Sequence, residues 1–373
     1  MDLIFWLDTV PVCCKGIFSA VAQKWDGITY FVCAGQLDEN RKKIINDGAD
    51  SSDKEKYVYL VAESEDFLHQ FIEKHKEDVH IFGGYRGKII NQVIKRTVGK
   101  KVFVWAERPC PPAQKERFPW ILFHKYFALK YRKKIAGLFP LGVSGVKSYE
   151  KYGWPKDKMF PLLYLPVLNE SIPLREKINE ESRTVKFIYL GRFTNKSKGT
   201  DVLMEAVRQL KEKNYTLDMV GGYGDYAEKT KSWIEKQENV KFGGTWPIGE
   251  VCERLCKYDV CVIPSKYEGW NVTLNEALMA GIGCIATDEC VSDEMITASG
   301  AGCVVRAGSS KELAEAMDDV MRNPEKINEW SKKAYDYRKY MTADVCANYF
   351  MDVINYQTAP HENTERPVAP WLI

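Results

Sequence analysis

Residues 268–281 read EGWNVTLNEALMAG, and this stretch indicates more about the fold and chemistry of the chain than any other. Two carboxylates, Glu268 and Glu276, stand eight positions apart, the first in a predicted loop and the second in a predicted short helix. The apolar run Val260–Ile263 precedes them and ends at a Pro-Ser pair. The predicted order is therefore strand, loop and helix. In an open parallel sheet this corner lies at the carboxyl ends of the strands, where ligands bind.

The start of the predicted helix, at residues 271–273, suits a phosphate group. The first N–H groups of a helix have no intrahelical partner, and they carry positive partial charge. A carboxylate on either side of a bound phosphate is well placed to accept hydrogen bonds from sugar hydroxyls. The pattern therefore predicts a ligand in which a phosphate joins a sugar and a ribose. The alternative is a surface helix whose two acids are solvated.

A second motif, GRFTNKSKG at residues 191–199, follows the predicted strand 185–190 and precedes a predicted helix at Val202. Gly191 at the end of a strand lets the backbone approach a ligand closely. The guanidinium of Arg192 can bind phosphate oxygens in a forked arrangement, and a lysine, Lys196 or Lys198, adds a point charge. On its own such a basic loop is usually only solvated, but the acidic motif follows in the same predicted domain.

The two motifs together resemble the GR…KG and E-x7-E elements of retaining glycosyltransferases with the GT-B fold, especially glycosyltransferase family 4 (glycosyltransferase group 1). The resemblance implies that Arg192 and Lys198 hold the diphosphate of a nucleotide-sugar donor. It also implies that Glu276 accepts the ribose hydroxyls and that Glu268 binds hydroxyls of the transferred sugar. Backbone groups at the helix start complete the implied diphosphate site, at Asn271, Val272 and Thr273.

Three further glycines resemble weaker elements of the same family. Gly222 lies in GGYGD, which is similar to the family's glycine-rich turn near the nucleotide, and Gly244 ends VKFGG, which is similar to the segment that reads the base. Gly16 closes the loop after the first predicted strand, where a glycine-rich loop usually approaches the donor phosphate. This loop holds a single glycine.

Many members of the family carry a histidine at the end of a middle strand of the first domain, close to the reacting carbon. The corresponding positions here contain Arg86 and Glu107, and either residue is a candidate for that place. His80 and His124 are expected to be structural.

Composition limits the class of protein. A chain of 373 residues predicts two domains, and 45% hydrophobic with 28% charged residues is typical of a soluble globular protein. A net charge of +2 argues against a nucleic-acid binder. The first residues lack the basic region of a signal peptide, and no apolar run reaches the roughly 20 residues that span a bilayer. The 11 cysteines form no framework spacing, so reduced thiols and a cytoplasmic location are expected.

Apolar runs alternate with helical patterns in both halves, which predicts an α/β protein of GT-B type with two Rossmann-like, doubly wound domains facing a central cleft. The first domain is expected at 1–168, completed by a returning helix at 343–356. The second is expected at 184–342, and residues 358–373 are expected to form a peripheral tail. Strands are predicted at 3–7, 29–33, 57–61, 79–82, 102–105, 138–143, 185–190, 217–220, 240–242, 260–263, 284–287 and 303–305.

Residues 115–134 hold seven lysines and arginines against one acid, interleaved with aromatic and aliphatic side chains. This pattern is typical of a helix that lies on a membrane surface. A core-packing helix with a solvated basic face would give the same pattern, and the sequence leaves both interpretations open.

We therefore predict a retaining glycosyltransferase that transfers a hexose-type sugar from a UDP- or GDP-sugar to a glycan or polyprenyl-linked acceptor. Surface polysaccharide synthesis at the inner face of a membrane is the expected setting. No metal or other cofactor is expected, because Arg192 and Lys198 can neutralise the phosphates. Two alternatives remain: a sugar-nucleotide epimerase or hydrolase on the same fold, and a catalytically inactive nucleotide-sugar-binding partner.

Overall fold

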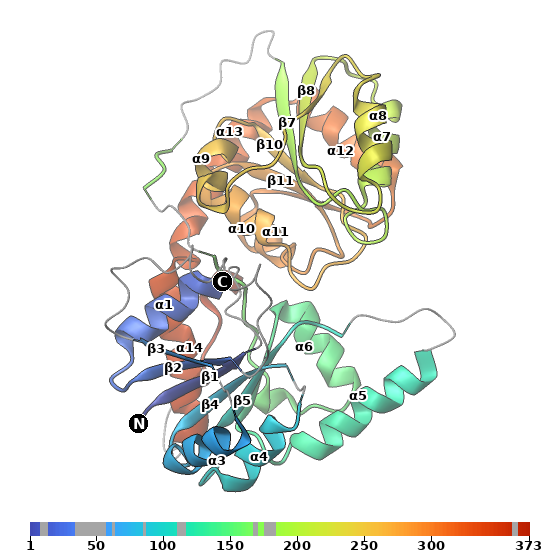
Figure 1. Cartoon of the computed structure of the whole chain (residues 1–373). Helices are drawn as coiled ribbons and strands as arrows, with labels where there is room; N and C mark the ends of the chain where they lie inside the picture. The colour runs from blue at the N-terminus through green and yellow to red at the C-terminus, as the bar shows by residue number, and fades with distance from the viewer. Residues whose placement is uncertain are drawn as a thin grey trace. The chain divides into compact units, whose positions relative to one another are not determined.

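The computed structural model describes residues 1–7, 14–33, 57–61, 64–84, 87–109, 117–166, 171–174, 184–359 and 365–373. They form two compact units (Figure 1). The first combines Met1–Pro166 with Ala343–Pro370, and the second combines Val167–Thr342 with Trp371–Ile373. Each unit is built around its own parallel sheet, and the GT-B fold predicted from the sequence is therefore confirmed.

The first unit contains a six-stranded parallel sheet in the order β3-β2-β1-β4-β5-β6. The five residues of β1 are all buried, as expected for a parallel strand covered by helices on both faces. Its strands are β1 Leu3–Leu7, β2 Thr29–Cys33, β3 Tyr57–Val61, β4 Val79–Gly83, β5 Val102–Ala106 and β6 Gly137–Pro140. Its helices are α1 Lys15–Lys24, α3 Glu65–Lys74, α4 Ile89–Arg96, α5 Arg117–Tyr131, α6 Gly142–Lys151, η3 Lys156–Lys158 and α14 Ala343–Thr358.

The strand predicted at 138–143 ends earlier than expected. Strand β6 stops at Pro140, and α6 already begins at Gly142. The apolar run continues past the end of the strand because Leu141, at the start of the helix, is itself fully buried. Periodicity cannot mark a boundary at which both flanking segments are buried.

The second unit also contains a six-stranded parallel sheet, in the order β12-β11-β10-β7-β8-β9. Its strands are β7 Val185–Gly191, β8 Tyr215–Gly221, β9 Val240–Phe242, β10 Val260–Ile263, β11 Gly283–Thr287 and β12 Gly302–Val305. Its helices are α7 Thr200–Gln209, α8 Ala227–Ile234, η4 Ile248–Glu250, α9 Val251–Leu255, α10 Val272–Met279, α11 Glu294–Ser299, α12 Ser310–Arg322, α13 Glu325–Tyr337 and η5 Arg338–Tyr340. The short helix η6 Pro370–Leu372 begins at the last residue of the first unit and ends in the second.

The order of the second sheet reverses between β7 and β10. The chain leaves β7 toward β8 and β9 on one side, and β10 pairs with the other side of β7. At such a point the loops after the two strands diverge to opposite faces and leave a crevice, which is where ligands bind in this class of sheet. The two sequence motifs follow these two strands.

The last helix belongs to the first unit. Phe350 of α14 stacks on Phe5 and Phe139, with ring centroids 6.1 and 4.8 Å apart. The predicted return of the chain is thus part of the first core.

The final residues do not form the peripheral tail that was expected. Trp371 is fully buried in the second unit, and its carbonyl accepts a hydrogen bond from the hydroxyl of Tyr337. A single large apolar side chain packs here without any repeating pattern, and the sequence therefore gave no helix or strand signal.

No helix within the described ranges is both long enough and apolar enough to traverse a bilayer.

Candidate functional site

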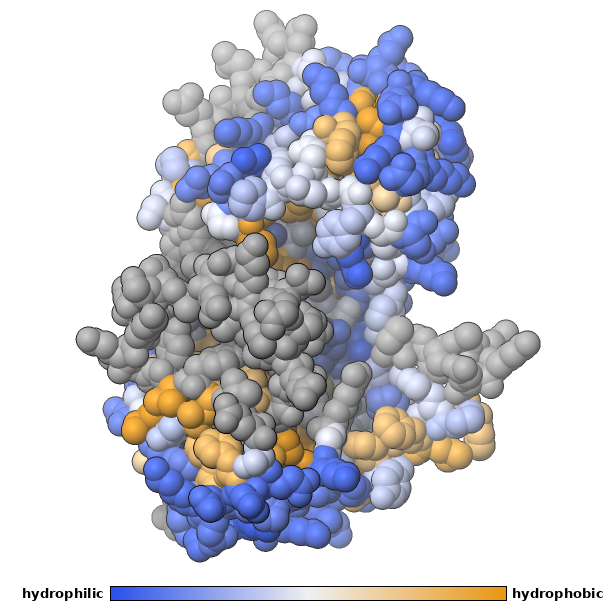
Figure 2. Space-filling model, in the orientation of Figure 1, coloured by the Kyte–Doolittle hydropathy of each residue, from blue (hydrophilic) through white to orange (hydrophobic). Residues whose placement is uncertain are grey.

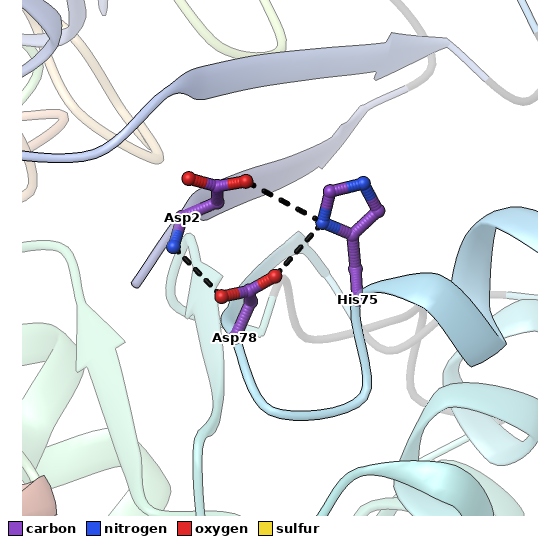
Figure 3. A group of neighbouring side chains, drawn as sticks. All are labelled: Asp2, His75 and Asp78. Atoms are coloured by element: carbon purple, nitrogen blue, oxygen red, sulfur yellow. Dashed lines mark hydrogen bonds and ion pairs between the residues drawn. The ribbon is translucent and has the colours of Figure 1, made fainter.

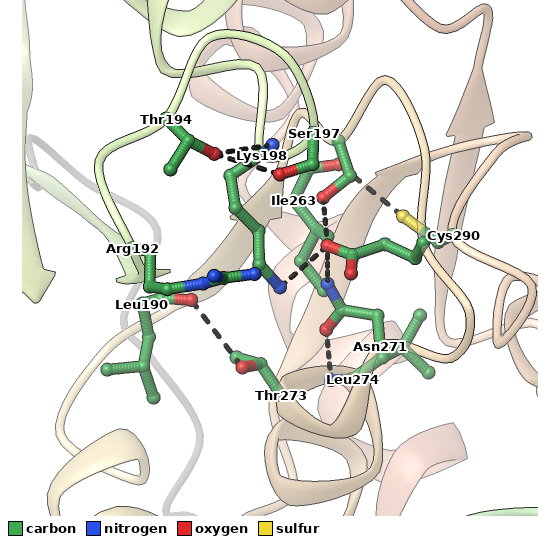
Figure 4. Close-up of polar contacts among 12 residues, drawn as sticks. Leu190, Arg192, Thr194, Ser197, Lys198, Ile263, Asn271, Thr273, Leu274 and Cys290 are labelled. Atoms are coloured by element: carbon green, nitrogen blue, oxygen red, sulfur yellow. Dashed lines mark hydrogen bonds and ion pairs between the residues drawn. The ribbon is translucent and has the colours of Figure 1, made fainter. Parts of the chain in front are cut away.

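The centre of the site is the carboxylate of Glu268, in the loop after β10. Its Oε1 atom accepts hydrogen bonds from Lys198 Nζ at 2.7 Å, Ser265 Oγ at 2.7 Å and Asn271 Nδ2 at 3.2 Å (Figure 4). Only 9% of the residue is exposed. Three donors on one oxygen fix the orientation of the side chain, and an ammonium donor makes the strongest of these bonds.

Asn271 joins this carboxylate to the start of α10. Its Oδ1 atom accepts a hydrogen bond from Leu274 N at 3.3 Å, which is the N-cap arrangement, while its Nδ2 group donates to Glu268. Thr273 Oγ1 donates to the carbonyl of Leu190 at 3.5 Å, so the first turn of α10 is also tied to β7. The predicted phosphate-binding helix start is therefore bonded both to β7 and to the loop after β10.

Lys198 reaches the carboxylate because Gly199 follows it. Gly199 has a φ of +64°, and a Cβ atom there would lie 1.9 Å from the carbonyl oxygen of Pro264. Only glycine allows this approach of the basic loop to the end of β10. The carbonyl of Ser197 also accepts a hydrogen bond from Lys266 N at 2.7 Å. The two loops therefore form one structure.

The structure distinguishes between the two candidate lysines. Lys198 is mostly buried and forms an ion pair with Glu268, whereas Lys196 is exposed. Arg192 is also exposed, immediately after β7. Its carbonyl accepts a hydrogen bond from Tyr189 Oη at 2.7 Å, and burial raises the pKa of that hydroxyl, which keeps it a donor. The backbone of Arg192 is therefore fixed while its side chain remains accessible.

Glu276 lies in α10, eight residues after Glu268, and only 8% of it is exposed. Burial raises the pKa of its carboxyl group to about 8. A largely desolvated carboxyl group that retains a little access to solvent is suited to hydrogen bonding with a ligand.

Sequence reasoning missed the loop between β11 and α11, which holds the acidic loop in place. The carbonyls of Glu289 and Cys290 accept hydrogen bonds from Glu268 N and Asn271 N at 3.0 and 3.2 Å. Ser292 Oγ donates to the carbonyl of Asn271 at 3.1 Å. Each of these bonds involves a backbone group, so no pattern of residue types predicts them. The only available signal was the position of the loop directly after a parallel strand.

Val291 in the same loop has a φ of +65°. A β-branched residue rarely adopts this conformation, and such strain is held only where the surroundings determine the backbone. The side chain is buried, which supplies that constraint.

The predicted glycines of the second unit all lie at the carboxyl edge of its sheet. Gly191 ends β7, and its carbonyl oxygen would lie 1.9 Å from a Cβ atom on Gly221. Gly222, with a φ of +104°, faces the ring of Phe242, 2.8 Å from where a Cβ atom would lie. Gly244, with a φ of +69°, has open space around it. Packing explains the glycine at 222, and backbone conformation alone explains the one at 244.

This arrangement agrees with the comparisons to known proteins. Residues 171–337 match the family model of the glycosyl transferases group 1. The match covers most of the second unit. The matched range contains every donor-site residue predicted from the two motifs.

The chain is similar to an uncharacterized 41.2 kDa protein in the cps region of Klebsiella pneumoniae, 29% identical over 46% of the chain and 43% of that protein. Another is the putative colanic acid biosynthesis glycosyltransferase WcaL of Escherichia coli K12, 30% identical over 36% of the chain and 35% of WcaL. The chain thus spans less than half the length of these curated relatives.

The fold of the whole chain is similar to that of Anabaena HepE in complex with UDP. The TM-score is 0.72 at 12% identity, and the match covers 95% of this chain and all of that one. The similarity of fold therefore extends over the first unit as well as the second.

In the first unit, the glycine predicted to approach the donor phosphate has another function. The N–H of Gly16 donates to the carbonyl of Leu165 at 3.0 Å, and a Cβ atom on Gly16 would lie 2.4 Å from the carbonyl oxygen of Pro166. Glycine is required here because two chain segments cross closely, and this N–H is already engaged. Residues 8–13 of the same predicted loop lie outside the described residues.

Of the two candidates for the missing histidine, Glu107 is described and Arg86 lies outside the described residues. Glu107 is exposed just after β5, and its Oε1 atom accepts a hydrogen bond from Tyr164 Oη at 2.6 Å. A carboxylate therefore stands at the carboxyl edge of the first sheet.

The two histidines are structural, as expected. His80 Nδ1 accepts a hydrogen bond from Trp6 Nε1 at 3.1 Å, and its Nε2 atom contacts the carbonyl of His75 at 2.9 Å. Burial lowers the pKa of His80 to about 4, so the ring is neutral. His124 packs between Trp120 and Tyr152, and burial lowers its pKa as well.

Among the described residues, one group could offer three ligand atoms to a cation: Asp2, His75 and Asp78 (Figure 3). His75 Nδ1 lies 2.8 Å from Asp78 Oδ2, and Asp2 N donates to Asp78 Oδ1 at 2.7 Å. Asp2 and Asp78 precede β1 and β4, so the group lies at the amino edge of the sheet, opposite the edge where ligands bind. These bonds tie the first strand to the turn before β4.

Proposed function

We propose that this chain is a retaining glycosyltransferase that transfers a hexose-type sugar from a UDP- or GDP-sugar to a glycan or lipid-linked glycan. The observation that carries the proposal is the fixed carboxylate of Glu268, bonded to Lys198 and to the N-cap residue of α10. This arrangement brings an acid, a cation and a helix N-terminus into contact at one edge of the sheet. The names of the relatives, above all colanic acid biosynthesis for WcaL, support polysaccharide synthesis as the setting.

The donor is assigned to the second unit by the chemistry of each residue. Glu276 binds the ribose hydroxyls, and the N–H groups of Val272 and Thr273 bind the diphosphate together with Arg192. An ammonium group has three N–H donors, so Lys198 can bond a phosphate oxygen while it keeps its bond to Glu268. Glu268 compensates part of the positive charge of Lys198. The exposed guanidinium of Arg192 is therefore expected to contribute more positive charge to the diphosphate site than Lys198 does.

In the proposed reaction, the bond between the anomeric carbon and the phosphate oxygen breaks, and a bond to the acceptor oxygen forms on the same face. The departing phosphate takes the proton of the acceptor hydroxyl. Negative charge grows on the phosphate in the transition state, so fixed cations stabilise that state more than the ground state. This is also why no metal is required in the proposal: Arg192, Lys198 and the helix start supply the positive charge.

Glu268 is assigned to orienting the sugar. A retaining reaction by double displacement needs a carboxylate free to attack the anomeric carbon. One oxygen of Glu268 already accepts three hydrogen bonds, which favours a positioning function. The first unit is assigned to the acceptor, with Glu107 or Arg86 as the candidate group beside the reacting carbon. The enzyme is expected in the cytoplasm at the membrane.

The test measures nucleotide release from UDP-, GDP- and ADP-sugars in the presence of EDTA. UDP-sugars come first because HepE is known in complex with UDP. Each donor is incubated with and without saccharide and polyprenyl-linked acceptors. Acceptor-dependent release is expected from one donor, and NMR of the product should show the same anomeric configuration as in the donor.

Arg192→Ala is expected to lower the rate about a hundredfold, since loss of one charge-stabilising group costs about 3 kcal/mol. Glu268→Gln is also expected to lower the rate, because it removes the carboxylate that orients the sugar and its ion pair with Lys198. The matched controls are Glu205→Gln and Arg208→Ala, an exposed ion pair on α7, which should leave the rate unchanged. Release without any acceptor would instead indicate a hydrolase, and conversion of the donor to an epimeric nucleotide sugar without net release of nucleotide would indicate an epimerase. Tight binding of UDP without turnover of any donor would favour the inactive binding partner.

A further inference from the structure

Helix α5 is apolar on two opposite faces. Its inner face packs on the first unit, with Ala128 and Tyr131 buried and Tyr131 Oη donating to Asn91 Oδ1 at 3.1 Å. His124 and Trp120 also lie on this inner side and pack on Tyr152. The core-packing interpretation of 115–134 is therefore correct for one face of the helix.

The outer face of α5, formed by Phe118, Leu122, Tyr126 and Leu129, is exposed to solvent. These side chains are 71%, 51%, 58% and 62% exposed. Their spacing of four, four and three residues puts them in one stripe along the helix. Phe123, 53% exposed, widens the stripe, and Figure 2 shows hydrophobic residues gathered over α5. A continuous apolar stripe of this kind marks a docking surface.

The charged residues that follow Glu116 along this stretch of the sequence are all basic. No Asp or Glu occurs between residues 117 and 149, whereas Lys125, Lys133 and Lys134 are exposed beside the stripe or just after it. Lys130 lies over the rings of Tyr126 and Tyr131, 5.9 and 4.9 Å from their centroids. A partner for this surface must combine an apolar interior with negative charge at its edge.

We propose that the outer face of α5 docks on the surface of a bilayer that contains anionic lipids, with the helix parallel to the membrane plane. The apolar stripe enters the boundary between headgroups and acyl chains while the lysines contact anionic headgroups. A helix of 15 residues is about 22 Å long, too short to cross a bilayer. A second copy of the chain fits less well, because a two-fold contact between identical faces would bring the lysines of both copies together.

This inference rests on the proposed function in one respect: membrane docking would place the protein where a lipid-linked acceptor is found. Binding to lipid does not require the donor site, so the two proposals can fail separately. Nucleotide release measured in solution with a saccharide acceptor reports on the donor site alone.

The full chain would be sedimented with vesicles of phosphatidylcholine alone and of phosphatidylcholine with phosphatidylglycerol. The fraction bound to the anionic vesicles is expected to be about tenfold higher and to fall as NaCl is raised, because salt screens exposed charges. The triple variant F118S/L122S/L129S should bind no better than the wild type binds phosphatidylcholine. Lys133→Gln with Lys134→Gln should remove much of the preference for anionic lipid.

The control is V98S/I248S/V368S, which also removes three exposed apolar side chains, 48%, 60% and 68% exposed, from other elements. It should bind as the wild type does. The proposal is overturned if the wild type stays in solution with anionic vesicles, or if the α5 triple variant still binds them. It is also overturned if sedimentation velocity shows a dimer that the α5 triple variant abolishes.

Discussion

At the scale of single residues, the site depends on carboxyl groups whose chemistry is set by what surrounds them. Glu268 and Glu276 are both glutamates in one short stretch, yet their environments differ. Glu268 is bonded to an ammonium and two neutral donors, whereas burial dominates at Glu276 and raises its pKa to about 8. One residue type thus stands in two environments: an ion-paired carboxylate at Glu268 and a buried carboxyl group at Glu276 whose pKa is raised to about 8.

The raised pKa of Glu276 predicts a stability that depends on pH. The folded protein holds this proton up to about pH 8, whereas the unfolded chain loses it near pH 4.5. Between these values the folded state binds more protons, so this group's contribution to stability is complete below pH 4.5 and is lost as pH rises to 8. Glu276→Gln should remove the loss, which is at most about 1.4 kcal/mol for each pH unit.

The measurement is urea unfolding of the wild type and Glu276→Gln at several pH values. All other titrating groups are shared, so the difference in the free energy of unfolding isolates Glu276. That difference should move in favour of the variant from pH 5 to pH 8 and then level off. A difference that does not change with pH would show that Glu276 is ionised in the folded protein.

At the scale of elements, the site exists because two loops approach each other closely at the point where the sheet order reverses. The basic loop after β7 and the acidic loop after β10 meet at Gly199 and Pro264. The loop after β11 then holds the backbone of the acidic loop from the other side. Each of these contacts involves backbone atoms. The loops therefore lie so close together that a larger side chain at the contact would force them apart.

Gly199→Ala tests this contact. The new methyl group would both occupy a left-handed conformation and lie 1.9 Å from the Pro264 carbonyl oxygen. The left-handed conformation costs about 1–2 kcal/mol, and forcing the loops apart adds about 1–3 kcal/mol. We expect lower stability and also weaker binding of UDP by calorimetry, because Lys198 moves away from Glu268.

Gly308→Ala is the matched control for this experiment. Gly308 has a φ of +79° and is exposed, and no atom lies within 4 Å of the position of the new methyl group. It should show the conformational cost alone and unchanged UDP binding. Equal effects of the two substitutions on UDP binding would contradict the importance of the contact.

At the scale of the whole molecule, the chain crosses between its two units more than once. It leaves the second unit at Thr342, forms α14 in the first unit, and returns so that Trp371 is buried in the second. The end of the chain is thus part of the unit that carries the proposed donor site, although α14 of the first unit separates the two in sequence.

Trp371→Ala should destabilise the second unit. Truncation of a buried tryptophan typically costs about 3–5 kcal/mol. Amide hydrogen exchange, followed by mass spectrometry, should accelerate in α13, whose Tyr337 bonds the carbonyl of Trp371, and should stay unchanged in β1 and β4. Ile373→Ala, at a residue that is 71% exposed, is the control and should leave exchange unchanged. Faster exchange in β1 as well would show that the two units lose structure together.

The sequence by itself determined the two-domain α/β architecture and nearly all strands, and it predicted Glu268, Glu276, Arg192 and Lys198 as candidate site residues. These follow from local patterns: apolar runs of strand length, a glycine or proline after each run, and charged residues at fixed spacing. Such patterns can be recognised in a sequence because the conformation and burial of a segment restrict which residue types occur at neighbouring positions.

The tertiary structure alone decided which of these residues meet. Lys198 and Glu268 are 70 positions apart in the chain, yet the pairing of β7 with β10 brings Nζ and Oε1 within 2.7 Å. Burial of Glu276, the packing reason for Gly16 and the two faces of α5 likewise depend on segments far apart in sequence. Contacts of this kind leave no periodic signal, because they are fixed by strand order and close packing rather than by the neighbours of each residue.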